Sequence, residues 1–557
     1  MRDQTGQRPP VGAPSRHSSS PRTLLLRAGF QNATRAGALL DDPALVALLP
    51  TADTDRPDRG RIRPSADSVR RLGGRPGDME LGPGREDLIE ALALTADPDL
   101  ALLNLVRLAE ASAAAETRLR ACELGAEPGC TRTPAALLHG LLTAADKDTA
   151  PSAGGDDSAE LLEFRRRLLA VLGASQALGD FLVAHPDRVT ALAPTRAWAA
   201  PGEPSAREAL WRAVQDSLDG ATAPEDGSGS ADPAERGTGV DRATAALRRA
   251  YRDRLMAIVA DDLTSPDPIE QVPTVCRRMA ELADAALDAA LLIARAAVGP
   301  QADDVALAVI AMGKTGAREL NYISDVDVVY ATEAVDGLTE QEAASRAARL
   351  ASLAAAACSG PGAEAPLWTV DANLRPEGRD GALVRTIGSY VAYWRKWAQT
   401  WEFQALLKAR AAAGDADLGR RFEEAAAPFV WSAATREGFV DAARRMRARV
   451  EESVGAARAA QEIKLGRGGL RDVEFTVQLL QLVHGRTDGA LRVRGTTEAI
   501  GALARGGYIG RADAAELCDC YAFLRAVEHR AQLPRMRRTH LVPAREAELR
   551  ALGRALD

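Results

Sequence analysis

Residues 313–330 read GKTGARELNYISDVDVVY, and the apolar run VALAVIAMG at 305–313 leads directly into them. The stretch passes into DVDVVYAT at 325–332, where acidic and apolar residues alternate. A short apolar run that ends in glycine and an alternating segment are typical of two β-strands joined by a polar turn. A helical pattern at about 338–358 and a third β-rich segment, PLWTVDANL at 366–374, come next. We therefore predict a small mixed β-sheet in this part of the chain.

The sequence on both sides of this sheet is predicted to be helical. Apolar residues recur at three- and four-residue spacing, and Gly and Pro interrupt the pattern where loops are expected. Aromatic residues make up only 4% of the chain and hydrophobic residues 46%, so Ala, Leu and Val must form most of the core. The helical ranges are 24–211, 242–263, 273–296 and 387 to the end, the last broken at Gly414, 465–469 and 506–510. The predicted fold class is α+β and predominantly helical, with a small mixed β-sheet domain embedded between helical regions and followed by a helical bundle.

Composition divides the 557 residues into five parts. Residues 1–23 lack an apolar segment and are predicted to be a disordered tail, and 24–218 form an N-terminal helical region. The stretch 219–241, DGATAPEDGSGSADPAERGTGVD, is predicted to be a flexible linker because Gly, Ser, Pro and Asp dominate it. Residues 242–412 contain the sheet. Residues 413–557 are the helical bundle, and its final residues, REAELRALGRALD, look like a helix that is cut short.

Composition also excludes several classes of protein. The formal net charge of −7 argues against a chain that coats nucleic acid. No run of about 18 uncharged apolar residues is present, so no membrane span is predicted. The six Cys lack the spacing of a zinc site and are predicted to be reduced thiols. We therefore expect a cytoplasmic protein that binds neither nucleic acid nor membrane.

Two aspartates in the quoted stretch are the candidate metal ligands. Asp325 and Asp327 lie two residues apart on a predicted strand, so their side chains project from the same face. Two carboxylates at that spacing repel each other unless a divalent cation lies between them, and Mg²⁺ prefers carboxylate oxygens. Asp371 on the third predicted strand is the candidate third ligand of a two-metal site for displacement at phosphorus. We predict that these three residues are catalytic and hold Mg²⁺, although an isolated D-x-D pair is often only structural.

The turn before these aspartates is predicted to lie along phosphate groups. Gly313 lets backbone amides approach a phosphate closely, and Lys314 and Ser324 supply side-chain donors. Gly313, Lys314 and Thr315 also resemble the end of a phosphate-binding P-loop, G-x-x-x-x-G-K-[ST]. That motif requires a Gly at position 308, where this chain has Ala, so the P-loop interpretation fails.

At these residues the chain resembles the nucleotidyltransferase superfamily of DNA polymerase beta, whose signature is a Gly, a spacer and then D-x-D on a strand. More narrowly, it resembles the bifunctional glutamine synthetase adenylyltransferase/adenylyl-removing enzymes. The matching segments are GKTGARELNYISDVDVVY (313–330), VDANLRPEGRDGALV (370–384), WEFQALLKARAAAGD (401–415) and IKLGRGGLRDVEFTVQLLQLVHG (463–485). Four such segments in the same order are much more specific than the D-x-D pair alone.

The resemblance implies an activity and its partners. Enzymes of this family carry two nucleotidyltransferase units: the N-terminal unit removes AMP from a tyrosine of glutamine synthetase by phosphorolysis, and the C-terminal unit attaches AMP from ATP. This chain carries one such motif after a long helical region, so it resembles the N-terminal, adenylyl-removing half. The implied partners are glutamine synthetase, inorganic phosphate, ADP or ATP, and a PII-type signalling protein. Two alternatives stay open: an ATP-dependent adenylyltransferase that uses the same site, and a non-catalytic regulatory binding module.

Four arginines are further candidates for binding nucleotide or phosphate. Arg375 and Arg379 follow the third strand on a predicted loop, where guanidinium groups suit phosphate oxygens. Arg467 and Arg471 lie in the Gly-rich segment 464–474, which leads into an apolar helix whose N-terminal amides favour anions. Surface salt bridges, or an ordinary corner between helices, are the structural alternatives for these arginines.

Five aromatic residues occur at helical spacing just after the predicted sheet. They are Tyr390, Tyr393, Trp394, Trp397 and Trp401. Such a stripe usually packs in a core, and we favour core packing over a platform on which adenine stacks.

Overall fold

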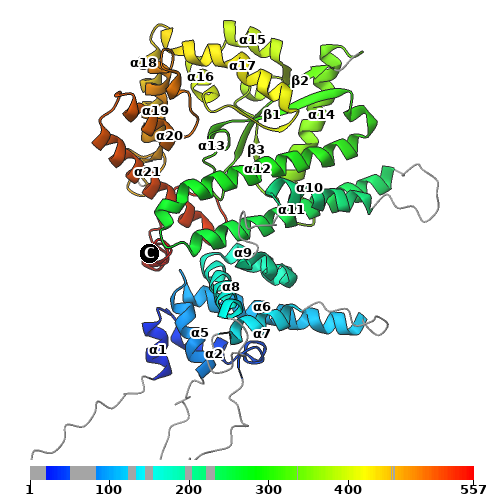
Figure 1. Ribbon diagram of the computed structural model, residues 1–557, viewed down its shortest axis with the longest axis vertical. Coiled ribbons are helices and arrows are strands. Elements are labelled where there is room, and N and C mark those ends of the chain that lie inside the picture. The colour runs from blue at the N-terminus through cyan, green and yellow to red at the C-terminus, as the bar shows by residue number, and fades with distance from the viewer. Residues whose placement is uncertain are drawn as a thin grey trace, which may run out of the picture.

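The computed structural model describes residues 20–50, 83–122, 133–144, 155–194, 204–220, 233–334, 337–452, 454–455 and 458–557. Helices account for most of these residues, and one five-stranded sheet lies among them. The predicted α+β class, predominantly helical with a small mixed sheet, is therefore confirmed. Figure 1 shows the sheet near one end of an elongated molecule and the N-terminal helices near the other.

The sheet is formed by strands from three separate parts of the chain. They are β1 (Val305–Ala311), β2 (Val326–Ala334), β3 (Val370–Asp371), β4 (Val384–Thr386) and β5 (Arg410–Gly414). Strand β1 pairs antiparallel with β2 on one side and with β5 on the other. Strands β3 and β4 both pair parallel with β2, so the sheet is mixed, as predicted.

Alternate residues of β1 pack into two different hydrophobic cores. Leu307 and Val309 belong to the core formed with α12 (Pro268–Val298) and α14 (Glu340–Ser359). Ala308 and Ile310 belong to the core on the opposite face, formed with α15 (Ile387–Lys396), α16 (Thr400–Leu406) and α17 (Ala416–Ser432). Figure 1 shows these two groups of helices on the two sides of the sheet. Because side chains alternate along a strand, a continuous apolar run such as VALAVIA fits a strand that is covered on both faces.

The aromatic stripe divides between the core and the surface. Tyr390 and Trp394 are buried against Phe422, with ring centroids 5.0 Å and 5.4 Å from that of Phe422. Core packing is therefore confirmed for these two residues. Trp397 and Trp401 are 62% and 39% exposed.

Three predictions about the elements of the sheet domain were wrong. The third strand was expected at 366–374, but β3 contains only Val370 and Asp371. Residues 410–413 were expected to be helical, yet with Gly414 they form β5, because the free edge of β1 is available for pairing. A helix was expected to begin at 273, but α12 begins at Pro268, where the Asp267 side chain accepts hydrogen bonds from the amides of Ile269 and Glu270.

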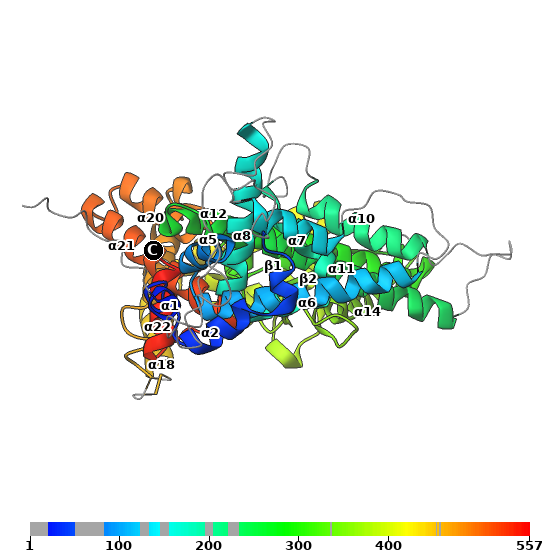
Figure 2. The same cartoon turned by 90° about the horizontal axis from the view of Figure 1, so that it is seen from below.

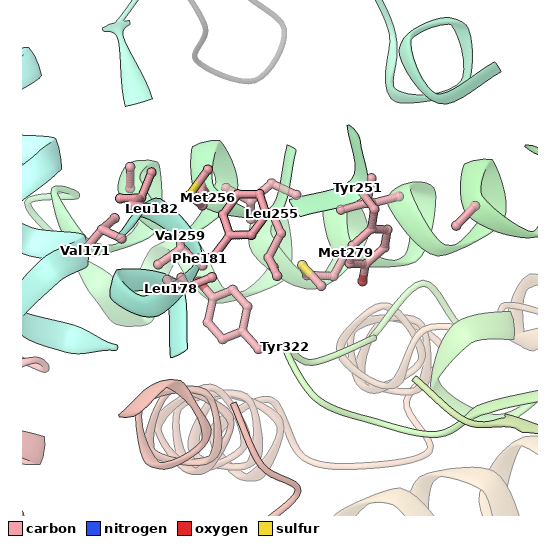
Figure 3. Packing of buried hydrophobic residues seen from close by; sticks show 14 of the residues in the cluster. Val171, Leu178, Phe181, Leu182, Tyr251, Leu255, Met256, Val259, Met279 and Tyr322 are labelled. Carbon is pink, nitrogen blue, oxygen red and sulfur yellow. The ribbon is translucent and has the colours of Figure 1, made fainter. Parts of the chain in front are cut away.

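The N-terminal region consists of shorter helices, some of which pack on the two long helices α11 (Pro233–Leu263) and α12. Its helices are α1 (Pro21–Arg27), α2 (Ala33–Leu40), α3 (Pro43–Val46), α5 (Pro83–Ala93), α6 (Pro98–Cys122), α7 (Pro134–Thr143), α8 (Gly155–Ala174), α9 (Gln176–Ala184) and α10 (Ala206–Asp219). Figure 3 shows side chains of α8 and α9 gathered against Leu255, Met256 and Val259 of α11. Helix α11 begins inside the stretch predicted to be a linker, and most of that stretch and of the predicted tail lies outside the described residues.

The C-terminal helices bring the end of the chain back to its beginning. They are α18 (Phe439–Glu452), α19 (Leu470–His484), α20 (Thr496–Arg505), α21 (Arg511–Gln532) and α22 (Glu546–Arg554). On α21, Arg530 forms a buried ion pair with Asp262 of α11. On α22, Arg554 donates to the carbonyl of Thr95, 3.1 Å away. Arg554 also lies close to Gly29, which follows α1, and α22 overlaps α1 in the view along the long axis in Figure 2.

In the described part of the chain, no single helix is long and apolar enough to cross a membrane. The bent pair Ser158–Ala174 and Gln176–Ala184 reaches that length and apolarity only when its two helices are taken together.

Candidate active site

Two neighbouring strands hold the three candidate carboxylates. Asp325 immediately precedes β2, and Asp327 is the second residue of that strand. Asp371 is the register partner of Asp327 on β3. The buried side chains of Val326 and Val328 anchor β2 in the core, so the aspartates occupy fixed positions at one end of the sheet.

The carboxylate of Asp327 lies in an environment that disfavours negative charge. Burial, and after it the carboxylates of Asp371 and Asp325, raise its pKa to about 6, against smaller opposing effects of Lys464 and Arg538. Three carboxylates that destabilise one another are the donor set that a divalent cation stabilises, and all their donor atoms are oxygens, which Mg²⁺ prefers. The residues therefore fit Mg²⁺ in their chemistry.

The side chains do not point toward one common centre. Asp325 forms an ion pair with Arg538, and Asp371 Oδ1 accepts a hydrogen bond of 2.8 Å from the amide of Asn373. Among the described residues, no three or more His, Cys, Asp and Glu side chains are arranged to enclose a metal ion. Asp325 would have to turn away from Arg538 in order to join Asp327 and Asp371 around a cation.

The turn after β1 needs glycine at its first position. Gly313 has φ +52° and begins the single-turn helix α13 (Gly313–Gly316). A Cβ atom at Gly313 would lie 2.5 Å from Asp327 Oδ2. The amide of Met312 donates to the carbonyl of Asp327 at 2.8 Å, which holds this turn against β2. The turn therefore touches the central carboxylate directly.

Lys314 lies at the site, but a carboxylate of the protein already engages it. Its Nζ atom is 2.9 Å from Glu528 Oε2 and 3.1 Å from Asn321 Oδ1. Burial, and after it the cation of Arg525, lower the pKa of Lys314 to about 8, although Glu528 opposes both effects. Glu528 is fully buried on α21, and its Oε1 atom also forms a hydrogen bond of 3.1 Å with Nδ1 of His540.

A cavity of about 320 Å³ opens in front of the carboxylates. Five cations line it: Lys314, Lys408, Lys464, Arg471 and Arg538. Its other lining residues are Gly313, Ser324, Asp325, Asp327, Asp371, Leu374, Trp401, Gln404, Ala405, Met446, Glu474, Phe475 and Gln478. The cavity thus combines acidic, cationic and apolar walls. Its volume lies at the lower end of the range of small-molecule sites.

The structure brings only one of the four predicted arginines to this cavity. Arg471 lines it. Arg375 instead closes its own loop by donating to the carbonyls of Gly381, Ala372 and Arg379, at 3.1, 2.9 and 3.0 Å. Arg379 and Arg467 are exposed and are absent from the cavity wall.

The predicted site residues did not include several residues of the cavity wall, among them Lys408, Lys464 and Arg538. A signal existed for the lysines: the chain has only five Lys among its 70 Lys and Arg residues. Three of those five, including Lys314, meet at this cavity. Arg538 had no comparable signal, because its segment reaches the site only through the packing of α21.

A mixed sheet that carries neighbouring aspartates behind a glycine turn, next to a cation-lined cavity, defines the class of nucleotidyltransferases. A family model described as glutamate-ammonia ligase adenylyltransferase matches residues 165–425, and one described as GlnD PII-uridylyltransferase matches residues 444–557. The chain belongs to the glutamine synthetase adenylyltransferase family.

Curated relatives of this family cover most of the chain. The chain is 46% identical over 479 residues to a bifunctional glutamine synthetase adenylyltransferase/adenylyl-removing enzyme of Streptomyces avermitilis. This match covers 86% of the present chain and 42% of the relative. It is 42% identical over 546 residues to the enzyme of that name from Streptomyces coelicolor, covering 98% of this chain and 45% of the relative. The identity to the enzyme of Mycolicibacterium smegmatis is 49% over 385 residues, which are 68% of this chain and 36% of the relative. The chain thus spans less than half the length of these relatives.

Proposed function

We propose that this chain acts in the cytoplasm as an adenylyl-removing enzyme, which takes AMP from a tyrosine of glutamine synthetase with inorganic phosphate and releases ADP. The observation that carries this proposal is the set of three aspartates, Asp325, Asp327 and Asp371, at one end of two paired strands and facing a cavity lined by cations. Such a site neutralises phosphate oxygens and positions the reactants, which is most of what displacement at phosphorus requires.

The three aspartates would hold Mg²⁺. When bound, the ion neutralises charge on the phosphoryl oxygens. The protein's own residues do the rest: the glycine turn at Gly313 leaves room beside Asp327, and Lys464 and Arg471 keep positive charge on the cavity wall.

The reaction exchanges one bond to phosphorus for another. An oxygen of hydrogen phosphate forms a bond to the phosphorus of AMP, and the bond from that phosphorus to the tyrosine oxygen breaks. The proton of hydrogen phosphate ends on the tyrosine oxygen, so ADP and free tyrosine result.

Two parallel reactions test the direction. In the first, the chain is incubated with Mg²⁺, phosphate and glutamine synthetase that carries AMP. In the second, it is incubated with Mg²⁺, ATP and unmodified glutamine synthetase. We expect ADP release in the first reaction, abolished in the Asp327→Asn variant. Incorporation of AMP in the second reaction without ADP release in the first would overturn the proposal.

A regulatory partner is a separate part of the proposal. The match of residues 444–557 to the PII-uridylyltransferase model supports a PII-type signalling protein as that partner.

A further inference from the structure

Three of the five cations that line the cavity are already neutralised by carboxylates of the protein. These ion pairs are Lys314–Glu528 at 2.9 Å, Lys408–Glu319 at 3.1 Å and Arg538–Asp325. A cation held this closely by a carboxylate of the protein has little charge left for a ligand. The free positive charge of the cavity must therefore come from the two remaining cations.

Lys464 has no such partner, and Arg471 has only a long ion pair, with Glu474. No ion pair or hydrogen bond joins the Lys464 ammonium to another described residue. Arg471 Nε is buried without a hydrogen-bond partner, and the carboxylate nearest to it, that of Glu474, is 3.9 Å away. The Arg471 guanidinium lies over the ring of Phe475, 5.5 Å from its centroid. A buried donor without an acceptor is costly, so Arg471 is poised for an anion.

Local structure holds the two cations next to each other. The amide of Arg471 donates to the carbonyl of Lys464 at 2.9 Å, which closes the Gly-rich loop between them. Burial lowers the pKa of Lys464, and the cations of Arg471 and Arg538 lower it further, against the opposing charges of Glu528 and Glu474. A bound dianion would favour the charged ammonium and so relieve this conflict.

We propose that Lys464 and Arg471 bind the attacking inorganic phosphate, at a subsite distinct from the carboxylates that would hold Mg²⁺ beside the phosphoryl group of AMP. This inference rests on the proposed function, because only phosphorolysis requires a second phosphate. Arginine offers a planar pair of donors to two phosphate oxygens, and lysine adds a compact positive charge. The aspartates belong to β2, its preceding residue and β3, whereas the two cations lie in and just after the Gly-rich loop that leads into α19, so different elements would supply the sites of the nucleophile and of the AMP phosphorus.

The test measures the KM for phosphate at saturating AMP-modified glutamine synthetase. Lys464→Gln and Arg471→Gln should each raise this KM at least about ten-fold, the loss expected for one charge-assisted hydrogen bond. The KM for the modified glutamine synthetase should change much less. Lys464→Arg keeps the charge and should stay within a few-fold of the wild type. Arg458→Gln removes an exposed cation that lies shortly before Lys464 and outside the cavity wall. This control variant should leave both KM values unchanged.

A binding measurement separates failure of this inference from failure of the proposed function. Inorganic phosphate should raise the thermal unfolding midpoint of the wild-type chain, and this rise should disappear in Lys464→Gln and Arg471→Gln. If the wild type releases ADP but the two variants keep its KM for phosphate, the inference is wrong and the proposed function stands. If phosphate leaves the midpoint of the wild type unchanged, the inference is wrong even if no turnover is found.

Discussion

Replacing Gly313 with alanine perturbs the site through a single methyl group. The residue has φ +52°, a conformation that costs an L-amino acid about 1–2 kcal/mol. The added Cβ would lie 2.5 Å from Asp327 Oδ2, whereas ordinary contacts begin at 3.4 Å. Backbone on both sides holds the turn, so the carboxylate must move, by about 1 Å.

The expected loss of activity is far larger than the loss of stability. A displacement of about 1 Å at a reacting centre lowers the rate by as much as about 100-fold. Backbone strain alone destabilises the chain by only about 1–2 kcal/mol. The Gly313→Ala variant should therefore fold, unfold at a slightly lower temperature, and release ADP from AMP-modified glutamine synthetase up to about 100-fold more slowly than the wild type.

Gly378 provides a matched control. Its φ is +58°, but the atom nearest to an added Cβ would be the carbonyl oxygen of Asn373 at 3.8 Å, and the residue does not line the cavity. Gly378→Ala should show the same loss of stability with turnover close to that of the wild type. Equal turnover in the two variants, or full activity of Gly313→Ala, would refute the idea that Gly313 keeps space for the Asp327 carboxylate.

Three further predictions concern the metal, the core and the nucleotide. Asp371→Asn should lower the rate of ADP release by at least about a hundredfold, because a bound metal ion stabilises the transition state by several kcal/mol. EDTA should abolish ADP release until Mg²⁺ is added, and activity that persists in EDTA would contradict this. Asp262→Ala breaks a buried ion pair and should cost about 3–5 kcal/mol in chemical denaturation, whereas Glu546→Ala, at an exposed pair, should leave the midpoint unchanged. Trp401→Ala should weaken inhibition by ADP about ten-fold if the base stacks there, whereas Trp397→Ala, outside the cavity wall, should have no effect.

Local pattern predicted the centre of the fold well. The runs VALAVIAMG and DVDVVYAT form β1 and β2, because a strand buried on both faces leaves a continuous apolar signal and a strand that carries a site leaves an alternating one. Strand β5 could not be predicted in the same way. Its residues, RAAAG, favour helix by local propensity, and only pairing with β1 makes them extended.

For the site, sequence reasoning named the residues of the sheet, but among the cavity residues that distant elements supply it named only Arg471. Asp371 could be proposed because it lies on a β-rich segment, and the structure pairs it with Asp327. Arg375 had the right chemistry but no partner visible in the sequence, and its own loop carbonyls engage it. Neither outcome could be deduced from spacing, because both depend on which backbone groups the folded chain leaves without partners.

The cavity is not a property of the sheet alone. Glu528 of α21 lies between Lys314 of the glycine turn and His540, so a helix more than 200 residues further along the chain fixes the charge of a residue beside the aspartates. The segment after α21 also contributes Arg538, which forms an ion pair with Asp325. Any movement of α21 or of the segment that follows it would alter both contacts together. Occupancy of the carboxylates by a cation and the packing of the C-terminal helices are therefore linked through the same side chains.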